Sequence, residues 1–512
     1  MKGYLPNIEL RFYFIFSVVL YTTMMYNIQI LSNASLSAYN LMDDGWKILN
    51  RKVDNYDSEW QVFKELIGNY GYWFAIHIIC TEIFRFTKFK NISLLYFTIG
   101  AFACLKIYNV RFFLALITQT VICYGVSTVF KRKTHIWVLT SFWLVILNSL
   151  KFESYFQTAM NVLDVEESKV HDFLVIFAWC ILKNISFNLE RISCHEKDER
   201  KFTFVHCLGY MFYFPSFHCG PTIIYSRYMS MLDHLNSSID KEYNLEMIKT
   251  RSKHLMLQML RFFGWYVITE IGLHFFYIHY IVMSKNLKSL NIFALFGLGF
   301  LNGQFFNNKY IIQYGVPIAL GKFENIPMPS TPRCICRVHK YSDMWKWFDN
   351  GLYEFLFKYI YTKMTTRSSS VPKKIFASFI TFFFIYIWHG FFDYILIWSI
   401  ANCVCIVVEK FVYDFIESES FNRSALKVIK TENNLHRLRA YIGAHILIPA
   451  ILSNFFFFGG TQFGMEFISR TYTNGLWNYF KISGTIFLLY PIAEAIKRYE
   501  QQRDSTKKKI IY

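Results

Sequence analysis

A histidine stands in the middle of a long apolar stretch of the chain. His389, in the tripeptide Trp388-His389-Gly390, divides residues 376–409 into two hydrophobic segments. An ionisable side chain this deep in apolar sequence is costly to bury, and such residues usually serve a function. Because an imidazole can accept or donate a proton, His389 is the first candidate for chemistry.

A carboxylate lies in a second, aromatic stretch. In residues 344–364 the apolar side chains recur at helical spacing, which predicts one helix with a single apolar face. Asp349 lies beside that face. On residue type alone, Asp349 is either a functional group or a structural carboxylate that pairs with Lys346 or Arg337.

The composition indicates what kind of protein must position these two side chains. Of 512 residues, 54% are hydrophobic, 20% are aromatic and only 18% are charged, which is too apolar for a soluble protein of this size. The sequence therefore predicts an all-α, multi-pass membrane protein. Its 11 cysteines have no paired spacing, so they indicate neither a disulfide framework nor a zinc site.

The positive charge of the chain is spread over short loops and the C-terminal tail. The formal net charge is +18, and basic clusters occur at residues 131–133, 373–374 and 507–509 rather than in one arm that could bind nucleic acid. We therefore expect no nucleic-acid partner. Such charge suits the cytoplasmic face of a membrane and attracts anionic headgroups or a phosphorylated substrate. We expect the basic tail, residues 497–512, to be cytosolic.

Hydrophobic runs near the length of a bilayer crossing recur along the chain. They are residues 12–31, 70–86, 92–107, 111–130, 135–150, 172–189, 263–283, 292–306, 308–320, the two halves of 376–409, 441–459 and 475–496. Residues 203–228 are also apolar, but Pro215 and Gly220-Pro221 interrupt them, which favours a re-entrant segment buried in protein. We predict one domain over residues 1–512, with about ten transmembrane helices and one or two re-entrant segments.

Polar stretches separate several of these runs. Residues 321–341 are polar and proline-rich, which predicts an extended loop. Residues 413–440 are charged and predict another loop. The polar sequence from Asn302 to Lys309 predicts that the runs on either side of it are separate pieces.

Five short motifs follow one another in the C-terminal part of the chain. They are YGVP at 314–317, PRC at 332–334, WFD at 347–349, WHG at 388–390 and SNFFFFGG at 453–460. With this ordered set the sequence resembles the membrane-bound O-acyltransferase superfamily. Within it, the sequence is similar to the Hedgehog acyltransferase family of protein-cysteine N-palmitoyltransferases, which includes insect Rasp-like proteins. The N-terminal part resembles the family only in hydropathy.

The resemblance implies a reaction and a place for it. Members of the family take palmitoyl from palmitoyl-CoA and attach it as an amide to the N-terminal cysteine of a secreted signalling protein. The implied partner is Hedgehog or a growth-factor ligand of the epidermal type, and the implied location is the endoplasmic reticulum membrane, among whose lipids the protein would lie.

The resemblance also implies roles for the two candidate residues. Both His389 and Asp349 match catalytic positions of the family. We favour Asp349 as the proton acceptor that orients the amine, and His389 as the group nearest the thioester, although the opposite assignment stays open. The competing interpretation is that the two side chains only pair with each other.

Three further residues match family sites. Cys334 matches a cysteine that ligates haem b, although the neighbouring Cys336 blurs this assignment, and either thiol could instead be palmitoylated or free. Trp345 and Asn454 match positions near the acyl-CoA channel. As an alternative, Trp345 is only part of an apolar helix face.

Three other functions remain to be compared with palmitoyl transfer. A lipid O-acyltransferase of the same superfamily commonly carries asparagine where this chain has Asp349. A non-catalytic regulatory relative should lack the histidine of the WHG motif, which is present here as His389. A transporter would differ from both, because its substrate flux should survive replacement of His389.

Overall fold

The chain folds almost entirely into α-helices. The computed structural model describes residues 5–34, 42–87, 91–194, 196–218, 220–238, 245–284 and 286–511, without the side chains of 153, 196–198, 233–238, 245 and 501–511. Within these ranges the only strands are β1 (Asp43–Asp44) and β2 (Lys52–Val53), which pair antiparallel.

In the first half of the chain, the two longest helices are the first and the eighth. In order along the chain, the helices of this half are α1 (Asn7–Ala34), α2 (Ser58–Tyr70), α3 (Tyr72–Phe86), α4 (Ile92–Ile107), α5 (Val110–Phe130), α6 (Lys133–Ser149), α7 (Glu153–Leu163), α8 (Glu167–Ile192), α9 (Phe204–Met211) and α10 (Tyr225–Ser238).

The second half contains the longest helices. They are α11 (Leu245–Phe275), α12 (Ile278–Met283), α13 (Ile292–Phe323), α14 (Tyr341–Phe348), α15 (Asn350–Leu356), α16 (Thr362–Met364), α17 (Val371–His389), α18 (Asp393–Ile416), α19 (Glu419–Ile429), α20 (Glu432–Ile468) and α21 (Leu476–Ile511). A π-helical turn, Phe357–Tyr361, links α15 to α16, and another, Ser469–Thr473, follows α20.

Six of the described helices are apolar and long enough to cross a membrane. These are α1, α5, α8, α17, α18 and α20, and the bent pair α6 and α7 would make a seventh if it formed one crossing. The prediction of an all-α, multi-pass membrane protein is thereby confirmed. The predicted total of about ten crossings stays a prediction, since length and composition alone do not decide it.

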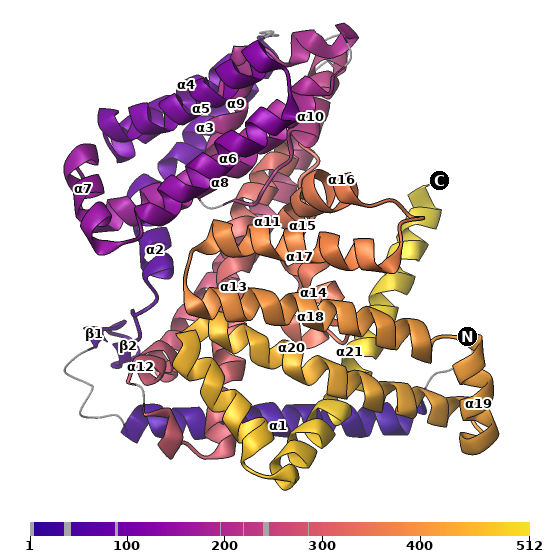
Figure 1. Ribbon diagram of the computed structural model, residues 1–512. Coiled ribbons are helices and arrows are strands. Elements are labelled where there is room, and N and C mark those ends of the chain that lie inside the picture. The colour runs from indigo at the N-terminus through magenta and orange to yellow at the C-terminus, as the bar shows by residue number, and fades with distance from the viewer. Residues whose placement is uncertain are drawn as a thin grey trace.

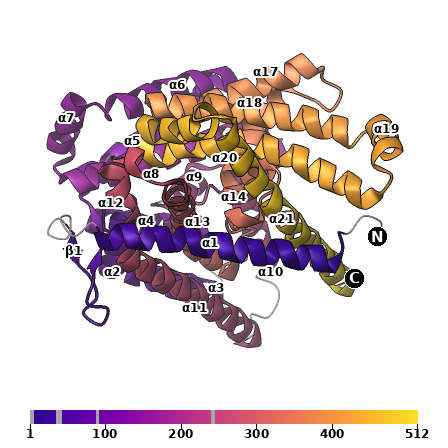
Figure 2. The ribbon, with the colours of Figure 1, turned by 90° about the horizontal axis from the view of Figure 1, so that it is seen from below.

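The helices form two groups around the long helix α13. In the first group, α4 packs on α9, and both α5 and α6 pack on α8. In the second, α17 packs on α18, and α18 packs on α20, so that these three helices lie in successive layers (Figure 1). Helix α13 contacts α1 on one side and α11 on another. Figure 2 shows α1 crossing the bundle next to α13.

Both ends of the chain lie at one end of this bundle. The N-terminal end of α1 and the C-terminal end of α21 lie on the same side of the bundle as α19 (Figures 1 and 2). The cytosolic location of residues 497–512 stays a prediction, and the side chains of most of this tail lie outside the described residues.

The predicted break between residues 292–306 and 308–320 is wrong, because α13 runs through both as one helix. The charged residue of the stretch that suggested a break, Lys309, is paired with a distant part of the chain. The ammonium of Lys309, which is almost fully buried, lies 3.0 Å from the carboxylate of Asp57 and 2.8 Å from that of Glu59. An ion pair this far apart in sequence leaves no local signal.

The predicted charged loop over residues 413–440 is also wrong. Helix α18 continues to Ile416, and α19 and α20 follow after short connections. The backbone N–H groups at the starts of these two helices are capped by the hydroxyls of Ser418 and Thr431, respectively. Capping residues of this kind initiate helices even in charged sequence. The predicted loop before α14 is confirmed over residues 324–340, apart from one 3-10 turn, Ile335–Arg337.

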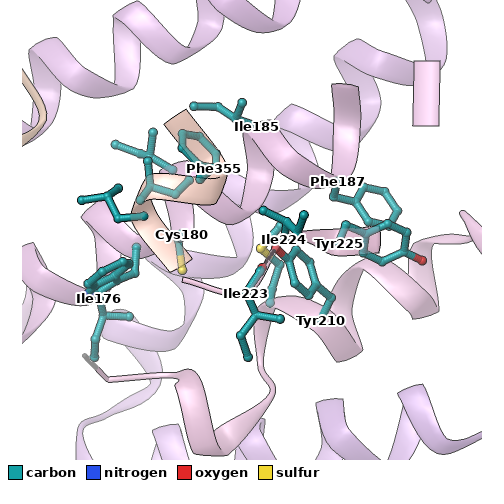
Figure 3. Close-up of a cluster of buried hydrophobic side chains, with 14 of the residues drawn as sticks. Ile176, Cys180, Ile185, Phe187, Tyr210, Ile223, Ile224, Tyr225 and Phe355 are labelled. Atoms are coloured by element: carbon teal, nitrogen blue, oxygen red, sulfur yellow. Dashed lines mark hydrogen bonds between the residues drawn. The ribbon is translucent and has the colours of Figure 1, made fainter. Parts of the chain in front are cut away.

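The re-entrant segment over residues 203–228 is broken where its prolines and glycine predict. Helix α9 ends at Met211, and an irregular segment precedes α10. Within that segment Ile223 and Ile224 are buried, packed with Tyr225 against α8 side chains and Phe355 of α15 (Figure 3). The segment is therefore enclosed by protein on both sides.

Candidate functional site

Helix α6 holds the turn that carries His389. His389 is the last residue of α17, and Gly390 ends the helix with a φ of 136°, which is strained for any residue with a side chain. The amide of Asn148 donates to Ile387 O at 2.8 Å and accepts from Phe391 N–H at 3.0 Å. The ammonium of Lys151 donates to His389 O at 2.8 Å. These contacts satisfy backbone groups that a helix end leaves open.

The imidazole of His389 lies among three aromatic rings. Its ring centroid is 4.8 Å from that of Trp388, 5.5 Å from that of Trp398 and 5.4 Å from that of Phe457. All three meet it at steep angles between ring planes. The imidazole is half-buried, so an accessible face remains beside it.

The structure brings Trp345 and Asn454 to the same place. The ring of Trp345 lies 5.6 Å from that of Trp398, whose indole N–H donates to Asn454 Oδ1 at 3.4 Å. Trp345 in turn donates its indole N–H to Asn402 Oδ1 at 2.9 Å. Trp398 of α18 thus contacts His389, Trp345 and Asn454, which come from α17, α14 and α20.

Asp349 does not lie within a continuous helix, and the single helix predicted for residues 344–364 is wrong. Asp349 separates α14 from α15 and caps α15, since its Oδ1 accepts from Leu352 N–H at 2.9 Å. Its Oδ2 accepts from the hydroxyl of Tyr314 at 3.1 Å. Aspartate is among the preferred residues at this position. The break aims the carboxylate toward α13, where Tyr314 lies.

Among the described residues, no cation forms an ion pair with the carboxylate of Asp349. Within the described chain neither Lys346 nor Arg337 pairs with it, and Arg337 instead bonds Glu500. Asp349 lies outside the spanning helices, and enclosure by protein atoms raises the pKa of its carboxyl to about 6 against the hydrogen bonds that lower it. A carboxylate with this pKa is a stronger base than an exposed one.

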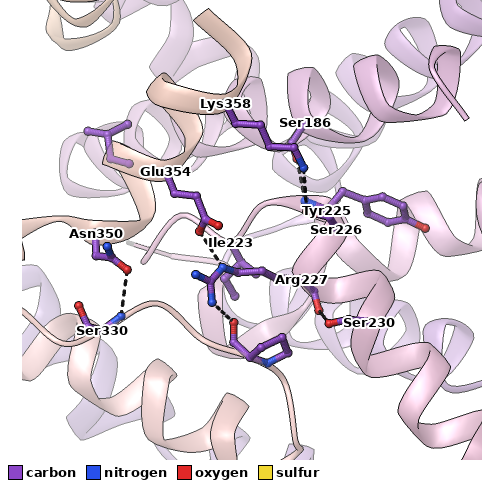
Figure 4. Close-up of polar contacts among 12 residues, drawn as sticks. Ser186, Ile223, Tyr225, Ser226, Arg227, Ser230, Ser330, Asn350, Glu354 and Lys358 are labelled. Atoms are coloured by element: carbon purple, nitrogen blue, oxygen red, sulfur yellow. Dashed lines mark hydrogen bonds and ion pairs between the residues drawn. The ribbon is translucent and has the colours of Figure 1, made fainter. Parts of the chain in front are cut away.

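A polar cluster fixes α15, and therefore Asp349, against α10 and the loop before α14. The guanidinium of Arg227 bonds the carboxylate of Glu354 at 2.6 Å, and Asn350 Oδ1 accepts from Ser330 N–H at 3.3 Å (Figure 4). At Gly351 a Cβ atom would come within 2.2 Å of a backbone oxygen of the re-entrant segment. Only glycine permits this close approach of α15 to that segment.

Aromatic rings connect His389 to Asp349. The ring of Trp388 lies 5.2 Å from that of Trp179, which lies 6.4 Å from that of Tyr314, the hydrogen-bond donor to Asp349. No hydrogen bond or ion pair between His389 and Asp349 is found among the described residues. The interpretation that they only pair with each other is therefore not what the structure shows.

Cys334 lies apart from these groups, beyond α14. It lines a small cavity of about 30 Å³ with Trp347 and Arg337. A hydrogen bond from Cys336 lowers the pKa of the Cys334 thiol below its ordinary value. A thiolate suits haem iron, but a cavity of this volume does not enclose a porphyrin. The residues present thus fit haem in donor chemistry and not in volume. No cluster of three metal-binding side chains occurs in the described ranges.

Sequence reasoning missed several residues of the site. Trp398 and Asn402 lie four residues apart within an apolar run, Asn148 lies near the end of another run, and Lys151 directly follows that second run. A polar residue within or beside an apolar span is itself a signal. This signal could have marked these residues as candidates, but it could not have shown that they meet His389 and Trp345.

Comparison with known proteins extends these observations. A model of the membrane-bound O-acyltransferase family matches residues 123–453, which include His389 and Asp349. Protein-cysteine N-palmitoyltransferase Rasp of Drosophila melanogaster is 29% identical over 91% of this chain and 90% of that protein. Protein-cysteine N-palmitoyltransferase HHAT of Mus musculus is 24% identical over 85% and 86%, respectively. Membrane-bound O-acyltransferase GUP1 of Saccharomyces cerevisiae is 21% identical over 76% and 74%. The similarity therefore extends well beyond the C-terminal motifs.

Proposed function

Because the chain belongs to the membrane-bound O-acyltransferase family, we propose that it transfers palmitoyl from palmitoyl-CoA to the amine of an N-terminal cysteine on a secreted protein. Two similar proteins, Rasp and HHAT, are named protein-cysteine N-palmitoyltransferases. The observation that carries the proposal is the uncompensated carboxylate of Asp349, connected to His389 through aromatic rings. The acceptors are Hedgehog or ligands of the epidermal growth-factor type, and the enzyme works in the endoplasmic reticulum membrane, where signal-peptide cleavage exposes such amines.

The reaction needs a group that accepts a proton more than it needs further activation of the thioester or the amine. A thioester is already activated, and an α-amine with a pKa near 8 is partly neutral at pH 7. The amine nitrogen attacks the thioester carbon, a C–N bond forms, the C–S bond breaks, and CoA leaves as a thiolate. The carboxylate of Asp349 accepts the proton that the nitrogen loses. A base with a pKa of about 6 is better matched to this task than one near 4.

His389 and its neighbours act on the acyl donor. The imidazole, held by the turn after α17, lies nearest the thioester and polarises its oxygen or protonates the leaving sulfur. Trp345 and Asn454 meet at Trp398 and line the channel for the acyl donor, with the indole as a wall and the amide as a polar contact. Productive geometry of this kind supplies much of the rate of an acyl transfer.

The proposal is tested with purified protein in detergent or nanodiscs. Labelled palmitoyl-CoA is supplied with a peptide that begins with cysteine, with the same peptide acetylated on its amine, and with a lysophospholipid. We expect label only on the free-amine peptide, in a bond that resists hydroxylamine because it is an amide rather than a thioester. Label on the lysophospholipid and not on the peptide would instead establish a lipid O-acyltransferase.

The contacts from α6 predict a positioning role for Asn148. Asn148→Ala leaves Ile387 O and Phe391 N–H without their partner, and an unsatisfied buried polar group costs roughly 1–3 kcal/mol. The turn that carries His389 should loosen, so we expect kcat to fall about tenfold or more, with a smaller change in KM for the peptide.

A serine on the same helix provides the control for this prediction. The exposed hydroxyl of Ser141 bonds only Trp137 O within its own helix. Ser141→Ala should therefore leave both kcat and the melting temperature unchanged. If Asn148→Ala retains the wild-type kcat, the turn is held by other contacts and the positioning role is wrong.

A further inference from the structure

A second cavity opens where α18, α20 and α21 meet. It has a volume of about 250 Å³ and lies apart from His389, between the loop before α14, the end of α18, the first turns of α20 and the last described side chains of α21. These elements meet at the end of the bundle where the two chain ends lie (Figures 1 and 2). Since α18 is a spanning helix that ends at Ile416, the cavity lies where an apolar span gives way to polar sequence.

The lining of this cavity carries four Lys or Arg side chains against two Glu side chains, Glu417 and Glu494, and among the described residues only one of these cations has no acidic partner. Lys340 pairs with Glu417 at 2.8 Å, and Lys497 pairs with Asp343. In the described part of the chain Arg439 bonds only neutral groups, namely the backbone oxygen of Ile416 at 3.2 Å and the side chain of Asn422. A guanidinium that lines a cavity without a counter-ion favours an anion there.

A buried histidine supplies a second, independent indication of a ligand. His339 lines the cavity and is only 6% exposed, and its Nδ1 atom has no hydrogen-bond partner. Its ring packs on that of Tyr490, with centroids 5.3 Å apart. A buried polar atom without a partner is costly unless a bound group completes it.

The surface beside the cavity indicates what kind of anion this is. Ile416, the last residue of the spanning helix α18, lines the cavity, and Phe411 and Phe415 in the last two turns of that helix are 48% and 63% exposed. Apolar side chains on a spanning helix face lipid. A ligand with a phosphate and fatty chains would place the phosphate at Arg439 and His339, and its chains would leave the cavity toward the lipid around the end of α18. Basic pockets between helix ends are a recognised binding mode for anionic lipid headgroups.

We propose that this cavity binds the headgroup of an anionic phospholipid. To test this, purified full-length protein in neutral detergent is titrated with phosphatidylserine or phosphatidylcholine, and bound lipid is counted by native mass spectrometry. We expect saturable binding of phosphatidylserine alone. Arg439→Gln should weaken it about fivefold, and Arg439→Lys should retain most of it. Arg423→Gln, which removes an exposed charge on α19 outside the cavity, should change nothing.

Other outcomes would overturn the proposal. Equal binding of the two lipids, or an equal loss in Arg423→Gln, would mean that the interaction is not made by the cavity. Displacement of phosphatidylserine by adenosine 3′,5′-bisphosphate, with a raised KM for palmitoyl-CoA in Arg439→Gln, would assign the cavity to the acyl donor instead. If Arg439→Gln does not fold, Lys340→Gln tests the same loss of charge. Binding is measured without turnover, so the result does not depend on the proposed enzymatic function.

Discussion

Asp349→Asn is expected to abolish palmitoyl transfer and, at neutral pH, to make the protein more stable. Asparagine can still accept a hydrogen bond from Leu352 N–H and occupies nearly the same volume, but it cannot take a proton from the attacking amine. Loss of a positioned general base typically costs between 10² and about 10⁴ in rate. We therefore expect kcat to fall by about a thousandfold in the peptide assay.

The gain in stability follows from the raised pKa of Asp349. Its carboxyl has a pKa of about 6 in the folded protein against an ordinary value of 3.8, so the folded state holds the proton more tightly than the unfolded state does. The contribution of Asp349 to stability is therefore greatest below pH 3.8, is lost as the pH rises toward 6, and is a net cost above that. At neutral pH the cost is on the order of 2–3 kcal/mol, and asparagine removes it.

Two measurements check these expectations together. The melting temperature of Asp349→Asn in detergent should exceed that of the wild type clearly at neutral pH and less so near pH 5. In the wild type, log(kcat/KM) should rise with pH below 8 because the peptide amine loses its proton, and its slope should steepen below about pH 6 because Asp349 also titrates. An inactive variant that melts below the wild type at neutral pH would mean that Asp349 is a structural cap rather than a base.

The sequence predicted the parts of this fold that depend on local composition. Apolar runs identified the spanning helices, and Gly390 marked the end of α17 because few other residues can follow His389 in that conformation. It did not predict the course of α13, since Lys309 is buried there through ion pairs with Asp57 and Glu59 at the start of α2, far away in the chain. Ion pairs between residues so far apart in the sequence produce no periodic pattern in the sequence around Lys309.

The candidate site also depends on contacts between residues that are distant in the sequence, and most of these contacts could not be predicted. The break at Asp349 had a local signal, because aspartate favours the position that caps a helix, but the apolar spacing around it predicted an uninterrupted helix. The meeting of Trp345, Asn454 and His389 around Trp398 had no local signal at all. Motifs could name these residues, whereas only the packing of α14, α17, α18 and α20 brings them together.

His389→Gln is expected to reduce kcat by about a hundredfold or more while the fold survives. Glutamine keeps a polar side chain of similar length in the space between Trp398 and Phe457, so it should not open a large cavity, but it cannot exchange a proton with the leaving sulfur. Phe457→Leu serves as the matched comparison. It alters the same aromatic surroundings and retains the imidazole, so its loss in kcat should be much smaller.

The double variant decides whether the two groups work in one step. If Asp349 takes the proton from the amine while His389 assists departure of the thiolate, removal of either group should already block the concerted path. Residues that act as a unit are strongly non-additive. We therefore expect the double variant Asp349→Asn, His389→Gln to be only slightly less active than the less active of the two single variants. A loss equal to the product of the single losses would show that they act in separate steps, and activity of His389→Gln near that of Phe457→Leu would remove His389 from the mechanism.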